Sequence, residues 1–345
     1  MPEEEIPDES EVLFERFAVT CAAGQEPLRI DKFLMNRIEG ATRNKIQQAI
    51  EAERVLVNDR AIRSNYKVRP LDKIVIYDNS APEQTEIIPQ EISIKIVYED
   101  DDLLVVDKEP GMVVHPGSGN PSGTLVNAIA WRLQQQGQLV SEATLARFGL
   151  VHRIDKNTSG LLVLAKSPKA MTDLAKQFFE HTVHRRYIAL VWGDFDQEEG
   201  TVRAHVGRHL RFRKQFAAYP DGDHGKEAIT HYRVLERFHY VTLIECRLET
   251  GRTHQIRVHM QLIGHPLFND ELYGGDRIVR GTVFTRYRQF VENCFAVCPR
   301  QALHAQQLGF IHPVTRQPMF FESPVPADMQ ELIVKWRNYA IHRKT

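Results

Sequence analysis

The chain contains few cysteines and no long apolar segment, and both absences exclude classes of protein. Its 345 residues include four cysteines, which have neither the density of a disulfide framework nor the paired spacing of a zinc ribbon. They indicate a reducing compartment. No apolar run of about 18 residues occurs, so no membrane span is expected. The start, MPEEEIPDES, also lacks the basic and apolar regions of a signal peptide. We therefore expect a cytoplasmic protein, and a monomer.

Motifs for metals and nucleotide cofactors are missing as well. Fifteen histidines are present, but His254 and His259 are five residues apart and do not share a helix face as a ligand pair would. Cys294 and Cys298 could share one, although two such residues are more often core cysteines. No H-E-x-x-H, C-x-x-C, P-loop or dinucleotide-binding glycine motif occurs. We expect neither a metal nor a cofactor.

The formal net charge of −1 conceals a strong asymmetry near the N-terminus. Residues 1–26 contain eight acids and one base, with almost no apolar periodicity, which predicts an acidic tail without structure. Residues 27–78 contain eleven bases and seven acids. A basic module is a candidate for binding nucleic acid, and an ordinary solvated surface is the alternative.

This basic segment has a recognisable order of elements. Apolar residues recur at helical spacing in residues 28–39, and Thr42 is the expected N-cap of a second helix. Arg43 and Lys45 lie in the first turn of that helix, where bases oppose the helix dipole but could face phosphate. Short strands are expected at residues 55–57 and 74–76.

The run RIDKFLMNR…TRNKIQQAIEAERVLVNDR…PLDKIVI resembles the small RNA-binding domain called S-four. It differs from the usual pattern at Glu53, Asp59 and Leu71, where that family commonly has glycine, and these differences concern local turn geometry. The resemblance implies an RNA-binding domain over residues 27–78. Its candidate RNA contacts are Arg29, Lys32, Arg43 and Lys45.

Beyond residue 78 the composition changes. Residues 79–91 are proline-containing and aperiodic, so they are expected to form a linker. Residues 92–328 mix strands irregularly with helices and show no repeating βαβ unit, which predicts an α+β domain with a largely antiparallel sheet. Residues 329–345 are expected to be a basic C-terminal helix or tail.

A basic segment with interleaved aromatics lies within this second domain. Residues 203–226 hold six bases and two acids, with Phe212, Phe216 and Tyr219 among them. Such a strip is typical of nucleic-acid contacts, because arginines bind phosphate and aromatic rings stack on bases. An exposed, solvated hairpin is the alternative. The candidate contacts are Arg208, Arg211, Arg213 and Lys214.

The run HRIDKNTSGLLVLAKS contains the main catalytic candidate. Residues 161–165 form a short apolar stretch after a glycine, which predicts a buried strand. Asp155 then lies in the loop that enters this strand. A loop aspartate most often caps a turn with its side chain. The neighbouring His152 and Arg153 make a functional interpretation worth considering.

Five polar segments together match one family. They are KEPGMVVHPG (108–117), HRIDKNTSG (152–160), RRYIALVWG (185–193), ETGRTHQIRVHMQLIGHP (249–266) and RQALHA (300–305). In this order they resemble the RluA/RluD-type pseudouridine synthases, whose signature segment is HRLDxxTSG. The sequence departs from the family at Ile154, where leucine is usual, and in PLFNDELYGG, where the family usually reads close to P-I-x-G-D-x-x-Y-G.

The resemblance implies roles for individual residues. Asp155 matches the catalytic aspartate and Tyr187 matches the ring that stacks on the bound uracil. Arg252 matches the basic partner of the aspartate, and Arg153 the arginine that helps displace the target uridine. The remaining substrate-binding candidates, taken from the same motifs, are His152, Lys108, His115, Thr158 and Leu303.

The implied activity is the isomerisation of uridine in structured RNA, with large-subunit ribosomal RNA as the expected substrate. An aspartate could attack ribose carbon 1 or remove the neighbouring ribose proton, and the sequence leaves both roles open. A non-catalytic RNA-binding or ribosome-assembly factor on the same fold is the first alternative. A nucleoside or glycoside hydrolase is the second, but it would need another carboxylate to activate water.

Overall fold

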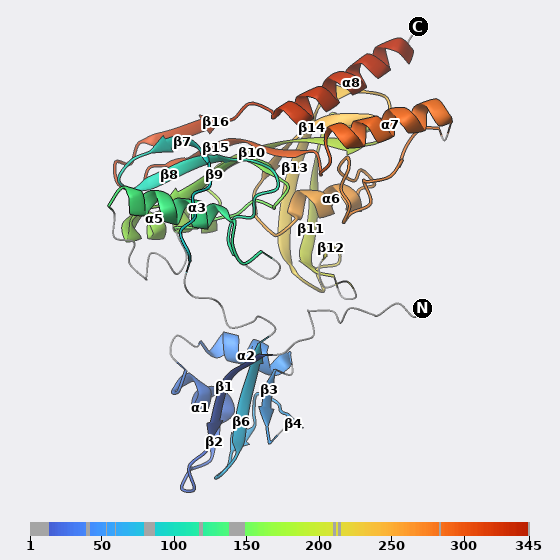
Figure 1. Cartoon of the computed structure of the whole chain (residues 1–345). Coiled ribbons are helices and arrows are strands. Elements are labelled where there is room, and N and C mark those ends of the chain that lie inside the picture. Colours follow the sequence, from blue (N-terminus) through green and yellow to red (C-terminus); the bar gives the residue numbers. More distant parts are fainter. Residues whose placement is uncertain are drawn as a thin grey trace, which may run out of the picture. The chain divides into compact units, whose positions relative to one another are not determined.

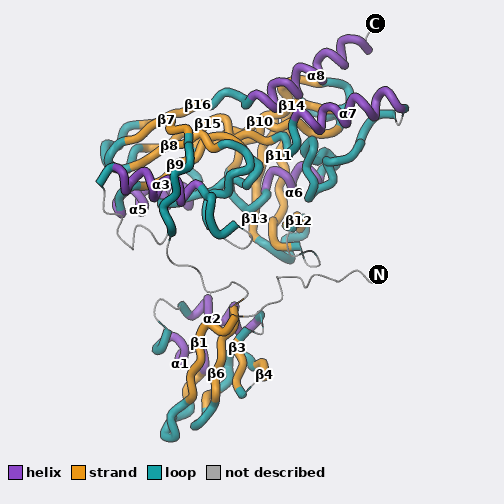
Figure 2. The backbone as a smooth tube through the Cα atoms, in the orientation of Figure 1, coloured by secondary structure: helices purple, strands orange, loops and turns teal. Residues whose placement is uncertain are grey.

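The computed structural model describes residues 14–38, 42–52, 54–58, 60–78, 87–116, 120–137, 149–209, 212, 215–282 and 284–343. The chain divides into two compact units, with the main division between Thr85 and Glu86. Figures 1 and 2 show the elements of each unit. Within the described residues, no helix is both long and apolar enough to cross a membrane.

The N-terminal unit packs two short helices against a small antiparallel sheet. The helices are α1 (Ile30–Met35) and α2 (Arg43–Glu51), and the sheet has the order β1-β6-β3-β4. The strands of the unit are β1 (Phe14–Thr20), β2 (Leu28–Arg29), β3 (Val55–Val57), β4 (Arg60–Ala61), β5 (Lys67–Val68) and β6 (Lys73–Asp78). Ile30, Phe33 and Leu34 of α1 are fully buried in its core.

Three features of this unit bear on the predictions made from the sequence. Thr42 is the N-cap of α2, and its side chain accepts a hydrogen bond from the backbone N–H of Lys45 at 3.4 Å. Strand β1 begins inside the segment expected to be an unstructured tail and pairs along β6, so the structured unit starts well before residue 27. Leu71 has a φ of 65°, which keeps the left-handed turn that glycine would favour.

The second unit is built on one long mixed sheet. Its described strands run in the order β12-β11-β13-β14-β10-β15-β9-β8-β7, and β16 pairs with β15. All of these pairs are antiparallel except β15 with β9. The strands are β7 (Lys95–Glu99), β8 (Leu103–Lys108), β9 (Ser159–Ala165), β10 (His184–Trp192), β11 (Glu199–Arg208), β12 (Phe216–Tyr219), β13 (Lys226–Arg237), β14 (Val241–Leu248), β15 (Leu303–Ile311) and β16 (Pro318–Glu322). The α+β class with a largely antiparallel sheet is confirmed.

Helices cover both faces of this sheet. One face carries α3 (Leu125–Gln135) and α6 (Gln255–Leu262), which pack in a core with Tyr187 and Ala189 of β10. The other face of β10 carries α7 (Thr285–Val297) and α8 (Ala327–Arg343), whereas α5 (Pro168–Phe179) packs against Leu161 and Val163 of β9 in a separate core cluster. Ile188 and Leu190, the alternate residues of β10, pack against α7 and α8. Strand β10 is therefore central, and its Tyr187 lies on the α3 and α6 side.

Both predicted borders of the second domain shift. Residues 87–91 were assigned to the linker, but the side chain of Asn127 in α3 donates to the carbonyl of Ile88 at 2.8 Å. Residues 329–345 were expected to be a separate helix or tail. They form most of α8, whose Met329 and Trp336 are fully buried in the core of this unit. The C-terminal helix is thus part of the second unit.

Candidate active site

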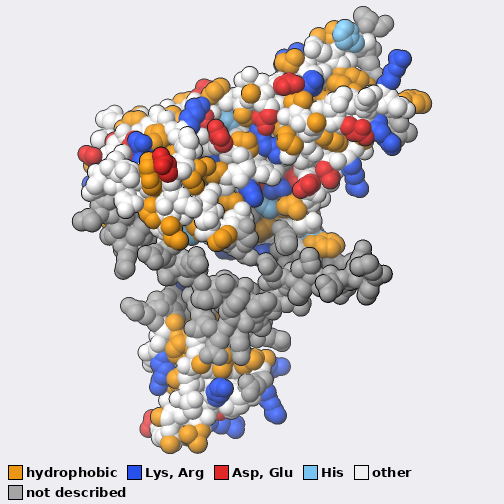
Figure 3. Space-filling view, in the orientation of Figure 1, with side chains coloured by type: hydrophobic (Ala, Val, Ile, Leu, Met, Phe, Trp, Pro, Cys, Tyr) orange, Lys and Arg blue, Asp and Glu red, His pale blue; other side chains and the backbone are white. Residues whose placement is uncertain are grey.

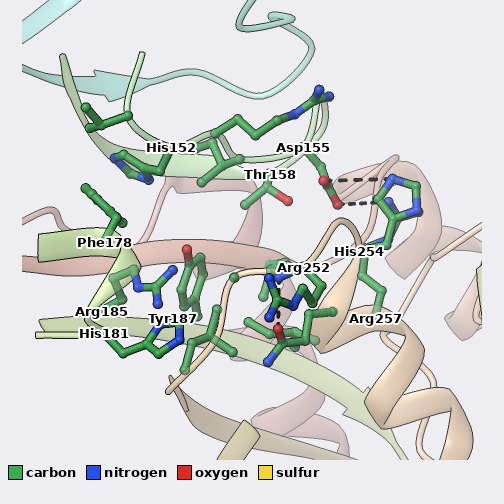
Figure 4. A pocket seen from close by; sticks show the side chains of 18 of the residues that line it. His152, Asp155, Thr158, Phe178, His181, Arg185, Tyr187, Arg252, His254 and Arg257 are labelled. Carbon is green, nitrogen blue, oxygen red and sulfur yellow. Dashed lines mark hydrogen bonds and ion pairs between the residues drawn. The ribbon is translucent and has the colours of Figure 1, made fainter. Parts of the chain in front are cut away.

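A cavity of about 470 Å³ opens in the second unit where the loop before β9, strand β10 and the start of α6 meet. Such a volume is in the usual range for small-molecule and nucleotide sites. Of the candidates from the sequence, the cavity wall contains His152, Arg153, Asp155, Thr158, Tyr187, Arg252 and Leu303. Residues distant in the sequence are thereby brought together, as Figure 4 shows.

Two buried cations hold the loop of Asp155 from behind. The Lys108 ammonium donates to the carbonyls of Glu109, Met112 and Lys156 at 2.8–2.9 Å. The Arg300 guanidinium donates to the carbonyl of Asn157 at 3.0 Å and is anchored by Asp328. Burial lowers the pKa of Lys108 to about 7. The two motif residues Lys108 and Arg300 therefore position the loop.

The Asp155 carboxylate has two neighbours on α6 and at its start. Arg257 Nη1 donates to Asp155 Oδ2 at 3.0 Å, and His254 Nε2 lies 3.8 Å from Asp155 Oδ1. The remaining guanidinium nitrogens of Arg257 bind the fully buried Asp270 at 2.7 and 2.8 Å. Asp270 lies in the segment PLFNDELYGG, where the sequence departs from the family pattern. The site therefore contains a chain from Asp155 through Arg257 to Asp270.

This chain corrects the predicted partner of Asp155. Arg252 was expected to pair with it, but Arg252 Nε donates instead to the carbonyl of Glu227 at 3.1 Å. The reason is local: His254 adopts a left-handed φ of 57°, and α6 begins only at Gln255. Arg252 therefore precedes the helix, while Arg257 is its third residue and points to Asp155. Arg252 still lines the cavity.

The opposite part of the cavity is formed by β10. Tyr187 is 8% exposed, and burial raises the pKa of its phenol, so it stays neutral. Arg185 lies two residues earlier on the same strand and also lines the cavity. Its guanidinium lies 5.5 Å from the centre of the Phe178 ring. Sequence reasoning included the segment that contains Arg185 but did not select this residue.

The remaining cavity candidates differ in their exposure and contacts. Arg153 is exposed at the cavity, whereas Thr158 and Leu303 are buried in its wall. His152 accepts the backbone N–H of Val163 at 3.0 Å and stacks on Phe178 at 4.3 Å. Burial lowers the pKa of His152 to about 3, so it is neutral near pH 7.

Two substrate-binding candidates lie outside the cavity wall. Lys108 uses its ammonium on three backbone carbonyls, as described above, and is only 3% exposed. His115 is exposed and contacts the carbonyl of Pro116. The geometry therefore gives Lys108 a positioning role instead of substrate contact, and it gives His115 no link to this cavity.

The basic strip approaches the cavity through an aromatic ring. Arg208 lies over the ring of Phe216 at 5.6 Å, and Phe216 contacts the ring of His254 at 5.5 Å in an edge-on arrangement. His254 in turn flanks Asp155. The strip candidates Arg211, Arg213 and Lys214 lie outside the described residues.

In the N-terminal unit, a buried carboxylate organises the basic surface, which is visible as blue side chains in Figure 3. Asp31 is fully buried and pairs with Arg29 at 2.9 Å and Arg43 at 3.2 Å. Lys32 and Lys45 are exposed. Asp31 was not selected from the sequence, although an acid among basic positions was a visible signal.

One side-chain cluster in the described residues has donor types that could hold a cation. It consists of Asp100, Asp102 and His312, with ligand atoms within 4.8 Å of one another. However, His312 Nε2 contacts Asp100 at 2.8 Å, and its Nδ1 accepts the N–H groups of Val314 and Thr315. The cluster therefore joins two loops by hydrogen bonds.

Comparison with known proteins identifies the fold and the family. Residues 102–262 match the family described as RNA pseudouridylate synthase, and residues 28–74 match the S4 domain. A protein of Chlorobaculum parvum, described as an uncharacterized RNA pseudouridine synthase, is 46% identical over 314 residues, covering 91% of this chain and 95% of that one. The chain belongs to the RNA pseudouridine synthase family. It is therefore an isomerase with an RNA-binding S4 domain.

Further relatives of the synthase agree. The ribosomal large subunit pseudouridine synthase D of Nitrosomonas europaea is 42% identical over 315 residues, covering 90% of this chain and 85% of that one. The solved structure of human RNA pseudouridylate synthase domain containing 4 has the same fold, with a TM-score of 0.54 at 20% identity over 70% of this chain and 93% of that one.

Proposed function

We propose that this synthase isomerises uridines of large-subunit ribosomal RNA, with Asp155 acting on the ribose of the target nucleotide. The observation that carries the proposal is the Asp155 carboxylate, held by Arg257 at 3.0 Å in the wall of the same cavity as the Tyr187 ring. The names of the relatives and the S4 domain support an RNA target in the ribosome. The protein is proposed to act as a cytoplasmic monomer.

The reaction needs few groups because it changes no oxidation state. The bond from ribose carbon 1 to uracil N1 breaks, the base rotates, and a new bond forms from carbon 1 to carbon 5. The proton of carbon 5 leaves to solvent, and N1 gains one. Asp155 either attacks carbon 1 or removes a ribose proton, and both roles require the ionised carboxylate that Arg257 supports.

The cavity residues divide the remaining work. Extrusion of a base from its stack costs a few kcal/mol. In our proposal Arg153 fills the vacated space, and Tyr187 stacks on the extruded uracil, with Thr158 and Leu303 completing the wall. Arg252 and Arg208 bind phosphate near the entrance. The S4 residues Arg29, Lys32, Arg43 and Lys45 contact RNA elsewhere on the substrate.

The test is tritium release from ribosomal RNA transcripts that carry tritium at uridine carbon 5. We expect release by the wild type, with the base retained in the RNA. Asp155→Asn should lower release by at least about 1000-fold, because the amide can neither attack nor accept the proton. Glu236→Gln, which alters a surface acid paired with Arg337, is the matched control and should keep the wild-type rate.

Other results would overturn parts of the proposal. Free uracil in the supernatant would indicate a hydrolase. RNA binding without release from any RNA would indicate a non-catalytic assembly factor. Release from transfer RNA transcripts but not from ribosomal RNA would refute the proposed substrate and keep the reaction. Asp155→Asn activity within tenfold of wild type would remove Asp155 from the catalytic role.

A further inference from the structure

Arg185 is a buried cation that has no anionic partner among the described residues. Its side chain lies at the cavity on β10, and the residue is 7% exposed. Its Nε is buried without a hydrogen-bond partner, and none of the described carboxylates forms an ion pair with its guanidinium. Phe178 contributes only the face of its ring, at 5.5 Å.

The neighbouring Arg186 also has a buried Nε without a hydrogen-bond partner, but unlike Arg185 it has an anionic partner. Arg186 follows it on the strand and pairs with Glu245 at 3.0 Å. On the cavity side, the Asp155 carboxylate is bound by Arg257 and does not contact Arg185. An unpaired buried charge is unfavourable in the free protein, and a bound anion would remove that penalty.

The surroundings of Arg185 leave room for such an anion. Gly251 borders the cavity, and a Cβ atom at this position would lie 2.6 Å from Arg185 Nη1. The same end of the cavity is lined by the exposed residues Phe179, which is 83% exposed, and His181. Figure 4 shows Arg185 beside Tyr187 and Phe178. The buried guanidinium can therefore be reached by a ligand that extends to the surface.

We propose that Arg185 binds a phosphate of the RNA strand next to the target uridine. A phosphodiester carries a full negative charge throughout binding, whereas uracil is neutral until its glycosidic bond breaks. The guanidinium fork suits two phosphate oxygens. Because Arg185 and Tyr187 are two residues apart on one strand, this contact fixes the nucleotide relative to the stacking ring. The inference rests on the proposed entry of RNA into this cavity.

The experiment compares binding of uridine 3′,5′-bisphosphate and uridine to the full chain by ligand-observed NMR at constant ionic strength. The wild type should prefer the bisphosphate. Arg185→Met should reduce this preference by about tenfold, the size expected for one charge-assisted pair. Gly251→Ala should also reduce it, because the new methyl group displaces the guanidinium and retains its charge. Arg186→Met, the matched control on the same strand, should leave the preference unchanged.

The ratio separates a phosphate contact from other roles of Arg185. If Arg185→Met weakens the binding of uridine and of the bisphosphate by the same factor, the residue contacts the base or only supports the fold, and the proposal is wrong. If Arg185→Met does not fold, Gly251→Ala takes its place. A Gly251→Ala variant that keeps the full preference for the bisphosphate would also show that the proposal is wrong. The titration uses only uridine and its bisphosphate. Its result is therefore independent of whether the protein modifies ribosomal RNA.

Discussion

Arg257 serves two carboxylates of different exposure. It binds Asp270, which is 1% exposed, through two nitrogens and Asp155 through a third. Burial lowers its pKa, but the hydrogen bonds and charge of Asp270, followed by those of Asp155, raise it overall. Asp270 therefore fixes the guanidinium in place before RNA binds. Preorganisation of this kind keeps the Asp155 carboxylate in one position.

Replacement of Arg257 should damage both catalysis and stability. We expect Arg257→Met to lower the single-turnover rate by about a hundredfold or more, because a preorganised cation is lost. The free energy of unfolding should fall by about 3 kcal/mol, because Asp270 is left buried and unpaired. Stopped-flow quench assays and urea unfolding measure the two effects.

A second substitution separates these effects. Arg257→Met combined with Asp270→Asn should recover part of the lost stability, because no unpaired charge remains buried, but it should not recover the rate. Arg252→Met is the control, because it removes another arginine of the same motif that does not contact Asp155. It should weaken RNA binding and leave the single-turnover rate of bound RNA unchanged. The opposite pattern, with that rate lowered only by Arg252→Met, would contradict the geometry.

His152 makes stability depend on pH. Burial, followed by the charge of Arg185, lowers its folded-state pKa to about 3, against about 6.5 in an unfolded chain. Between these values the unfolded chain binds a proton that the folded chain does not. Its contribution to stability is therefore complete above pH 6.5 and is lost progressively as the pH falls.

We expect His152→Gln to reduce this acid sensitivity. Between pH 7.5 and 5.5, the wild type should lose about 1 kcal/mol more of its unfolding free energy than the variant, since only the wild type carries the titrating ring. Tryptophan fluorescence in urea reports on the second unit alone, because the three tryptophans are Trp131, Trp192 and Trp336. Equal losses in both proteins would show that His152 does not titrate as proposed.

At the scale of elements, local patterns predicted much of what positions the site. The apolar run at residues 161–165 lies in β9, directly after the loop of Asp155, and the expected strands at residues 55–57 and 74–76 lie in β3 and β6. Thr42 caps α2 as expected. These features depend on neighbours within one turn or one strand, so periodicity and capping residues are sufficient to find them.

Long-range contacts explain what the sequence did not reveal. The pair of Arg257 and Asp155 spans 102 residues, and the left-handed His254 that shifts the start of α6 has no distinctive pattern. The sequence contained a weak signal for Arg257. The apolar residues Ile256, Val258 and Met260 lie on both sides of it in the helix, which predicts that the arginine side chain is not freely exposed. Strand β1 was missed for a similar reason. The acidic composition of residues 1–26 concealed a strand that is stabilised by distant β6.

Strand β9 pairs in parallel with β15 directly after the loop that contains Asp155, and this pair joins the two parts of the sheet. Gly160 has a φ of 111°, and a Cβ atom there would lie 2.2 Å from the carbonyl oxygen of Ala305. We expect Gly160→Ala to lower the free energy of unfolding by about 3 kcal/mol, because a backbone clash adds to the strain of positive φ. Thermal and urea unfolding measure this change.

Gly264 provides a matched control. It has a φ of 83°, but a Cβ atom there would meet nothing within 4 Å. Gly264→Ala should therefore cost only about 1 kcal/mol, from backbone strain alone. Similar losses for both variants would show that the contact between β9 and β15 yields to a methyl group, and that positive φ dominates.

At the scale of the whole molecule, we propose that the two units contribute different kinds of RNA contact. In this proposal the second unit holds the groups of the cavity that act on one nucleotide, among them Asp155, Tyr187 and Arg257. The N-terminal unit carries exposed bases on two small helices, with Arg29 and Arg43 tied to the buried Asp31. Removal of either arginine would leave Asp31 less compensated, so a test of RNA binding should avoid them.

Lys32 and Lys45 are the suitable positions for that test, because both are exposed. The double variant Lys32→Gln with Lys45→Gln should weaken RNA binding at low salt. Each lost phosphate contact lowers the slope of log affinity against log salt by roughly 0.7 for single strands and 0.9 for duplex. We therefore expect a decrease of about 1.4 to 1.8 in the slope, and an unchanged turnover rate at saturating RNA, because neither lysine lines the cavity.

The control is Lys176→Gln with Lys335→Gln, which alters two lysines of the second unit that have acidic helix neighbours at 3.7 and 3.6 Å. It removes the same formal charge from positions already neutralised locally, so its slope should stay near the wild-type value. If both double variants changed the slope equally, total charge and not the S4 surface would determine RNA binding.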